Sequence, residues 1–137
     1  MRSNRSMPAS TVIPVLGYDN VPEAAAWLVR VFGLRERLRI ADHRIQMQFG
    51  NADLVISDAG SPAPKPRPSF SVMLRVDDVD AHYARVTAAG ADVAGPPETF
   101  PYGERQYSVR DPGGHRWTFS QTVDDVDPVS WGGEPVG

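Results

Sequence analysis

Cysteine is absent from this chain of 137 residues. Its absence excludes disulfides, thiolate metal ligands, iron–sulfur clusters and cysteine nucleophiles together. Long hydrophobic runs are also missing, because the longest, residues 24–29, is far shorter than the roughly 20 residues of a membrane-spanning helix. No apolar segment follows Arg2 and Arg5, so we expect no secretion signal. These absences favour a cytoplasmic protein that does not contact membranes.

An excess of positive charge is missing as well, since 14 Lys and Arg stand against 17 Asp and Glu. The formal net charge is −3 and the sequence pI is about 5.5, whereas nucleic-acid-binding domains usually carry a basic face. We therefore expect no nucleic-acid partner. The hydrophobic fraction of 41% and the charged fraction of 23% are those of an ordinary globular protein, and the length suits one domain.

The first half of the chain predicts the order β-α-β-β-β. Residues 11–17 are β-branched and apolar, which favours a strand. Asn20 can cap a helix whose apolar residues recur at helical spacing, and Gly33 can end it. The strands predicted after this helix cover residues 35–40, 44–49 and 53–57.

The second half repeats the first. Residues 61–68 carry four prolines at alternate positions, which predicts an extended connector. Beyond it, a shift of 58 residues lays Asn20 on Asp78, and a second helix is predicted from there to Gly90. Residues 111–114 have Pro and Gly at the places typical of a type II turn. The strands predicted in this half cover residues 70–76, 91–94, 105–110 and 115–121.

This repeated order predicts an α+β fold. Tandem βαβββ modules would form curved mixed sheets around a cup, with the helices on the outside. We expect one domain overall, in the order of a flexible N-terminal arm (residues 1–10), a first module (11–60), a Pro-rich linker (61–68), a second module (69–121) and an acidic Gly- and Pro-rich tail (122–137).

Two motifs carry a family resemblance. Val-Asp-Asp-Val-Asp at residues 76–80 opens the second helix, which ends in Ala-Ala-Gly at residues 88–90. Val-Arg-Asp-Pro-Gly-Gly-His follows at residues 109–115. The chain thereby resembles the vicinal oxygen chelate superfamily, the glyoxalase/bleomycin resistance protein/dioxygenase group, over about residues 11–121. The resemblance implies a bacterial homodimer in which two modules line a cup for a metal or a ligand.

The resemblance also implies where metal ligands would lie. Enzymes of that superfamily place His, Gln or Glu in the first and last strands of each module. The matching positions here are Ile13 and Ser71, then Thr118 and one of Val55, Ile56 and Ser57. None of these side chains is a carboxylate, an amide or an imidazole, whereas a divalent ion needs three or four convergent nitrogen or oxygen donors. We therefore expect no metal site and no other cofactor.

Strand alternation predicts which side chains face the cup. The predicted set is Ser71, Met73 and Arg75 on one strand with Arg116, Thr118 and Ser120 on another. Two arginines in a half-buried cup favour a carboxylate, phosphate or phenolate ligand, because burial without an anionic partner is costly. The alternative is that Arg75 and Arg116 pair with acidic neighbours or lie at the rim in water.

Loop aromatics extend the candidate site. Phe100, Tyr102 and Trp131 lie in segments rich in Gly and Pro, where they could stack on a ligand or hold the loops onto the body of the protein. Trp131 could also act as a lid. By contrast, Trp117 and Phe119 alternate with Thr118 and are predicted to be buried under a helix.

His115 is the one candidate catalytic residue. Histidine is the commonest general base, but His115 directly follows a Gly-Gly turn, where it can serve turn geometry instead. His43 and His82 show no metal-ligand spacing. The sequence therefore leaves the catalytic residues open.

Together these features predict a metal-independent small-molecule binding protein of the glyoxalase/bleomycin-resistance type. Its ligand would be a neutral or anionic aromatic compound, sequestered as resistance proteins sequester drugs. The alternatives are a divergent metal-dependent lyase or dioxygenase, a metal-free enzyme using His115 or a cup arginine, and a structural module whose cup is filled by side chains such as Met73.

Overall fold

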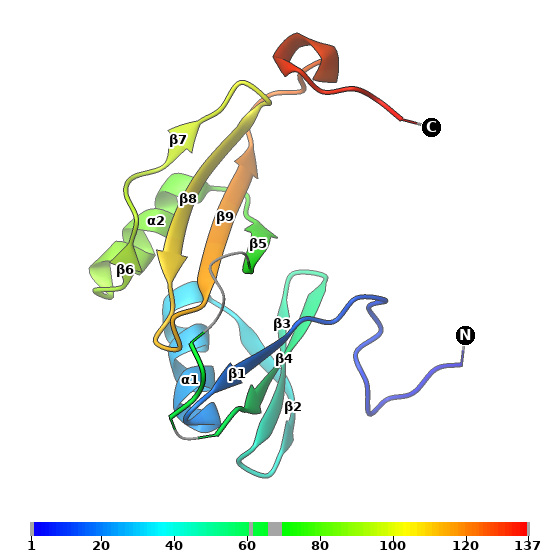
Figure 1. Cartoon of the computed structure of the whole chain (residues 1–137), viewed down its shortest axis with the longest axis vertical. Helices are drawn as coiled ribbons and strands as arrows, with labels where there is room; N and C mark the ends of the chain where they lie inside the picture. The colour runs from blue at the N-terminus through cyan, green and yellow to red at the C-terminus, as the bar shows by residue number, and fades with distance from the viewer. Residues whose placement is uncertain (1, 61, 66–69, 137) are drawn as a thin grey trace. The chain divides into compact units, whose positions relative to one another are not determined.

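The computed structural model describes residues 2–60, 62–65 and 70–136. Residues 61 and 66–68 of the predicted linker lie outside these ranges. The chain forms two compact units, one of residues 1–68 with 111–115 and the other of residues 69–110 with 116–137. Each unit holds one sheet and one main helix (Figure 1).

The first unit is a four-stranded sheet with one helix. Its elements are β1 (Val15–Tyr18), α1 (Val21–Trp27), the π-helical turn η1 (Leu28–Phe32), β2 (Arg35–Ile40), β3 (Arg44–Phe49) and β4 (Ala52–Asp58). The strand order is β1-β4-β3-β2, in which β1 runs parallel to β4 and the other pairs are antiparallel.

Both ends of the first helix follow from its sequence. The side chain of Asn20 accepts a hydrogen bond of 3.0 Å from the backbone N–H of Glu23, which caps a first-turn donor. At the other end, the N–H groups of Gly33 and Leu34 both donate to the carbonyl of Leu28, so the last turn is π-helical. Gly33 adopts a φ of 88°, which explains the glycine there.

The second unit has the same plan with one extra short strand. Its elements are β5 (Ser71–Arg75), α2 (Val79–Ala88), β6 (Asp92–Val93), β7 (Glu98–Thr99), β8 (Glu104–Arg110), β9 (Arg116–Thr122) and the 3-10 turn η2 (Pro128–Trp131). The strand order is β5-β9-β8-β6, with β7 paired to β8. As in the first unit, the first strand pairs in parallel with the last strand.

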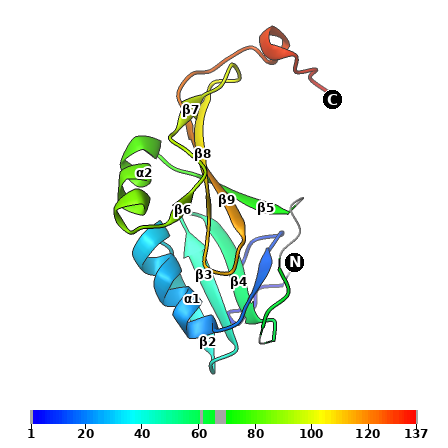
Figure 2. The same ribbon diagram turned by 60° about the vertical axis from the view of Figure 1, so that its left-hand side comes forward.

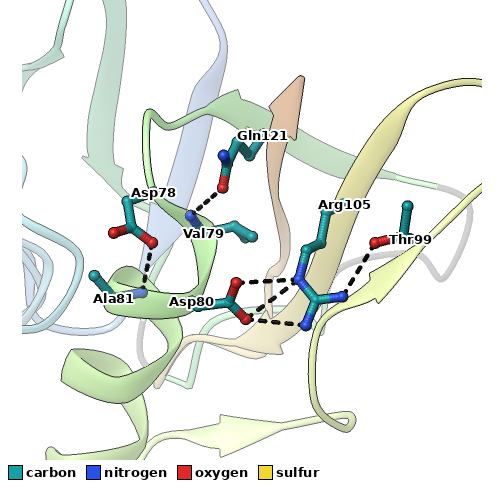
Figure 3. A network of polar contacts seen from close by, with 7 residues as sticks. All are labelled: Asp78, Val79, Asp80, Ala81, Thr99, Arg105 and Gln121. Atoms are coloured by element: carbon teal, nitrogen blue, oxygen red, sulfur yellow. Dashed lines mark hydrogen bonds and ion pairs between the residues drawn. The ribbon is translucent and has the colours of Figure 1, made fainter. Parts of the chain in front are cut away.

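Side chains from two strands hold the start of α2 in place (Figure 3). Asp78 caps the helix by accepting from the N–H of Ala81 at 3.0 Å. The N–H of Val79 donates to Oε1 of Gln121 on β9 at 2.9 Å, so another first-turn donor is satisfied. Arg105 on β8 donates to both carboxylate oxygens of Asp80. These contacts fix the helix against β8 and β9.

In each unit the helix covers one face of the sheet, and no helix of the described residues covers the opposite face (Figure 2). Beneath α2, Trp117 and Phe119 are fully buried, as the alternation predicts. The buried side chains of the first unit include Leu28, Phe32 and Ile56. The α+β prediction with tandem modules and two curved sheets is thereby confirmed.

Three local predictions differ from the structure. The first strand begins at Val15 and not at residue 11, so Ile13 precedes it. The predicted loop after residue 94 contains β7. The turn at residues 111–114 has its positive φ at Gly114 (82°) and not at Gly113, so it is not of type II. Within the described ranges, no helix is long and apolar enough to cross a membrane.

Candidate functional site

The open face of the second sheet gathers the polar side chains of three strands. Between β5 and β9 the pairs on this face are Ser71 with Arg116, Met73 with Thr118 and Arg75 with Ser120. Between β9 and β8 they are Thr118 with Ser108 and Ser120 with Gln106. Because side chains alternate across a strand, these residues share one face, and the buried Val72, Leu74 and Trp117 point to the other. The predicted set therefore lies together.

A cavity of about 540 Å³ lies on this face. Its floor comes from β5, β8 and β9, and a wall comes from the segment between β6 and β8. The lining residues are Ser71, Met73, Ala94, Gly95, Pro96, Glu98, Phe100, Gln106, Tyr107, Ser108, Arg116 and Thr118. A volume of this size suits a small organic ligand.

One end of the cavity presents a positive charge. Nη2 of Arg116 donates to Oγ of Ser108 at 3.4 Å, and the hydroxyls of Ser108 and Thr118 lie 2.8 Å apart. No carboxylate of the described residues forms an ion pair with Arg116. Since a guanidinium has five donors, most of those of Arg116 are available to a ligand.

The other end of the same face holds a chain of hydrogen bonds. The hydroxyl of Tyr102 donates to Gln106 at 3.3 Å, Gln106 Nε2 donates to Ser120 at 3.0 Å, and Ser120 donates to Glu104 at 2.7 Å. The Ser120 hydroxyl, followed by that of Thr122 and the charge of Arg75, lowers the pKa of Glu104 below its ordinary value. Arg75 makes the smallest of these contributions, and it forms no ion pair with a carboxylate of the described residues.

The structure separates the predicted ligand-binding residues into two groups. Ser71, Met73, Arg116 and Thr118 line the cavity. Arg75, Tyr102 and Trp131 do not. Sequence reasoning missed Gln106, Ser108 and Glu98, although alternation along β8 could have indicated the first two once its pairing with β9 was known.

The loop aromatics form a cluster beside the cavity. Phe100 lines the cavity and stacks on Tyr102, with ring centroids 5.4 Å apart and an interplanar angle of 4°. Tyr102 in turn contacts Trp131 of η2 at a centroid distance of 5.4 Å. Trp131 is 44% exposed. Among these three aromatic residues only Phe100 lines the cavity. Tyr102 packs against Phe100, and Trp131 packs against Tyr102.

His115 belongs to the first unit and is buried there. Its Nε2 lies 2.8 Å from the carbonyl oxygen of Gly17, which can only accept, so Nε2 carries the proton. Its ring packs edge-on against Tyr18 at 4.9 Å, and its Nδ1 has no hydrogen-bond partner among the described residues. These contacts suit a structural role, and His115 is not among the residues that line the cavity.

Asp111 organises the turn that precedes His115. Its carboxylate accepts from the N–H groups of Gly113 and His115 at 3.0 and 2.9 Å and from the hydroxyl of Tyr18. A Cβ at Gly113 would lie 2.8 Å from the ring of Tyr18. Asp111 is 5% exposed, so the Asp-Pro-Gly-Gly-His motif fastens this turn to β1.

The superfamily's metal-ligand positions do not fit a metal in this chain. The shift of 58 residues that lays Ile13 on Ser71 also lays Val15 on Met73. Val15 pairs with Val55 in the first sheet and Met73 pairs with Thr118 in the second, so Val55 is the equivalent of Thr118. The four positions thus supply two aliphatic side chains and two neutral hydroxyls, which is a poor donor set for a divalent ion. Among the described residues, no group of three or more His, Asp or Glu side chains lies close enough together to hold a metal ion.

Two buried tyrosines predict a loss of stability at alkaline pH. Burial raises the pKa of Tyr18 above its ordinary value, and the charge of Asp111 raises it further. Burial and Tyr83 likewise raise the pKa of Tyr107. The pKa of each tyrosine is higher in the folded state than in the unfolded state, so the stability that each one contributes is fully present below pH ~10. Above that pH the free energy of unfolding falls by about 1.4 kcal/mol per pH unit for each tyrosine.

Urea unfolding between pH 9 and 11.5 measures this slope. We expect the Tyr18→Phe variant to unfold with a shallower pH dependence than the wild type, by about 1.4 kcal/mol per pH unit. Equal slopes above pH ~10 for the two proteins would contradict the buried, protonated state of Tyr18.

Comparison with known proteins agrees with this fold. The profile of the Glyoxalase/Bleomycin resistance protein/Dioxygenase superfamily matches residues 12–119. The chain belongs to this superfamily. The match covers both modules, including both sheets and the Asp-Pro-Gly-Gly turn.

Individual proteins share sequence or fold with the chain. It is similar to TioX from Micromonospora sp. ML1, with 35% identity over 86% of this chain and 100% of that one and a TM-score of 0.69. The fosfomycin resistance protein FosX of Listeria monocytogenes shares the fold at 16% identity, 84% and 94% coverage and a TM-score of 0.68. An uncharacterised protein of Mycobacterium bovis is 40% identical over 57 residues, which span 42% of this chain and 38% of that protein.

Proposed function

We propose that this superfamily member binds a small aromatic compound bearing an acidic group, and that it does so without a metal ion. The observation that carries the proposal is the cavity of about 540 Å³ with Arg116 in its lining and no carboxylate paired with that arginine among the described residues. We propose that a homodimer of this protein sequesters the compound in the cytoplasm.

The cavity has two chemically different ends. Nη2 of Arg116 lies 3.4 Å from Oγ of Ser108, and Gln106 is two residues before Ser108 on β8. The guanidinium is therefore about 7 Å from the backbone position of Gln106 along the strand, at the usual rise per strand residue. A compound with one or two rings can reach from one to the other.

The middle of the cavity supplies apolar contact. Met73 is 61% exposed in the floor, and Phe100 contributes to the wall together with Pro96. Burial of ring carbons against these side chains would be favourable, because apolar surface leaves water. Glu98 and Gln106 at the far end offer acceptors for a hydroxyl or amide group of the ligand.

A matched set of probes tests the proposal. We expect 2-naphthoate to raise the melting temperature and to bind in calorimetry, 2-naphthol to bind more weakly, and a naphthylmethylammonium ion to bind least. Glu98 is the acidic group of the lining, so preference for the cation would assign recognition to Glu98 and overturn the proposal.

Metal independence has its own test. We expect native mass spectrometry of the untagged protein, after incubation with Ni²⁺, Mn²⁺, Fe²⁺ or Zn²⁺, to show no ion bound at one per subunit, because the four superfamily positions lack suitable donors. The same spectra report whether the protein is a dimer. One tightly held ion per subunit would favour the alternative of a metal-dependent lyase or dioxygenase.

A further inference from the structure

The face of the first sheet opposite α1 is occupied by the chain's own N-terminal arm. Nη2 of Arg37 donates to the carbonyl of Arg5 at 2.9 Å, and Nε2 of Gln46 donates to the carbonyl of Ser6 at 2.8 Å. The hydroxyl of Ser10 donates to Asp53 at 2.6 Å. Three side chains of β2, β3 and β4 therefore hold residues 5–10.

The place that the arm occupies corresponds to the cavity of the second sheet. Parallel pairing sets Val15 beside Val55 in one sheet and Met73 beside Thr118 in the other. The next strand adds Gln46 in the first sheet and Ser108 in the second. The cavity of the second sheet is lined by Met73, Thr118 and Ser108. In the first sheet the equivalent of Ser108 is Gln46, and it is only 2% exposed.

The arm is held in a different way from a strand. Among the described residues before Val15, none belongs to a strand, and only the carbonyl of Pro14 accepts a backbone hydrogen bond from the sheet, from the N–H of Val55 at 2.9 Å. Residues 5–10 are attached to β2, β3 and β4 by the side chains of Arg37, Gln46 and Asp53 and by burial of Pro8, and Asp53 also accepts from the backbone of Ser10. A segment ordered by few side-chain contacts is the kind that detaches without unfolding the sheet beneath it.

We infer that the face of the first sheet opposite α1 is a second binding site, specific for a peptide segment that forms a turn as residues 4–7 do, and that residues 5–10 are its removable occupant. Arg37 and Gln46 recognise two successive carbonyl groups, and Asp53 recognises a hydroxyl donor beyond them. Arg37 and Gln46 are also hydrogen-bonded to each other, which orients both toward the carbonyls. Detachment of the arm opens the site.

The test uses the full-length protein and changes only the arm. In the Pro8→Gly/Ser10→Ala variant the arm loses its buried ring and the hydroxyl bond to Asp53, while the face stays intact. We expect trypsin to cleave after Arg5 at least about tenfold faster than in the wild type, the effect of losing roughly one hydrogen bond and one apolar contact. Ser3→Ala, which lies before the held segment, is the matched control and should leave the rate unchanged.

Binding in trans provides the second readout. A fluorescein-labelled peptide of residues 2–12 should bind the Pro8→Gly/Ser10→Ala variant at least about tenfold more tightly than the wild type, because the tethered arm competes in the wild type at a high effective concentration. Adding Gln46→Ala to the variant should abolish that binding. Equal cleavage rates would overturn the removable arm, and faster cleavage without peptide binding would overturn the second site.

Discussion

Replacing Arg116 with glutamine is expected to weaken binding of an aromatic carboxylate by about 10- to 100-fold. A hydrogen bond to a charged group contributes about 1.5–3 kcal/mol, and each 1.4 kcal/mol is a factor of ten in affinity. Arg116 is exposed in the lining, and among the described residues its guanidinium bonds to the Ser108 hydroxyl alone, so its other donors are available to a ligand. Glutamine keeps much of the volume and removes the charge.

Calorimetric titration with 2-naphthoate measures the effect, and Arg75→Gln is the matched control. Arg75 lies on the same face, but it does not line the cavity and its charge acts on Glu104. We expect the control to change the affinity by less than about threefold, as a surface charge outside the site does. Equal losses in the two variants would indicate general attraction of anions to this face, and no loss in Arg116→Gln would remove Arg116 from the site.

The Asp111→Ala variant is expected to lose about 3 kcal/mol or more of unfolding free energy. Asp111 is buried and accepts from two backbone N–H groups and from the hydroxyl of Tyr18. Removal leaves these donors without their acceptor, and each unsatisfied buried group costs about 1–3 kcal/mol. Urea denaturation at pH 7 measures the difference.

Two further variants distinguish the loss of these hydrogen bonds from the loss of a negative charge in general. Tyr18→Phe removes one of the three bonds and should cost about 1–2 kcal/mol. Asp125→Ala, at an exposed position of the tail, removes the same charge and should change stability by less than about 0.5 kcal/mol. An Asp111→Ala variant as stable as Asp125→Ala would show that the turn does not depend on this carboxylate.

The sequence predicted the parts of the site that follow from local periodicity. Alternation along two strands was enough to place Ser71, Met73, Arg116 and Thr118 on one face, because successive side chains of a strand point to opposite sides. The buried pair Trp117 and Phe119 followed from the same rule. Gln106 and Ser108 were missed because they come from β8, whose register against β9 is a long-range property.

The arm and the two arginines show the limit of such reasoning. Nothing in residues 5–10 indicates that their carbonyls meet Arg37 and Gln46, because those side chains come from strands about 30 to 40 residues away. Similarly, Arg75 and Arg116 are equivalent by alternation, and only the fold brings Arg116 into the lining of the cavity and leaves Arg75 outside it.

The amino-acid sequence by itself determined the repeated β-α-β-β-β order, the helix ends at Asn20, Gly33 and Asp78, and the faces of the strands. These features depend on spacing and on the conformational preferences of neighbouring residues. The tertiary structure decided which open face holds a cavity and which is covered by the arm. The reason is physical: both outcomes depend on contacts between segments far apart in the chain, and short-range periodicity carries no information about them.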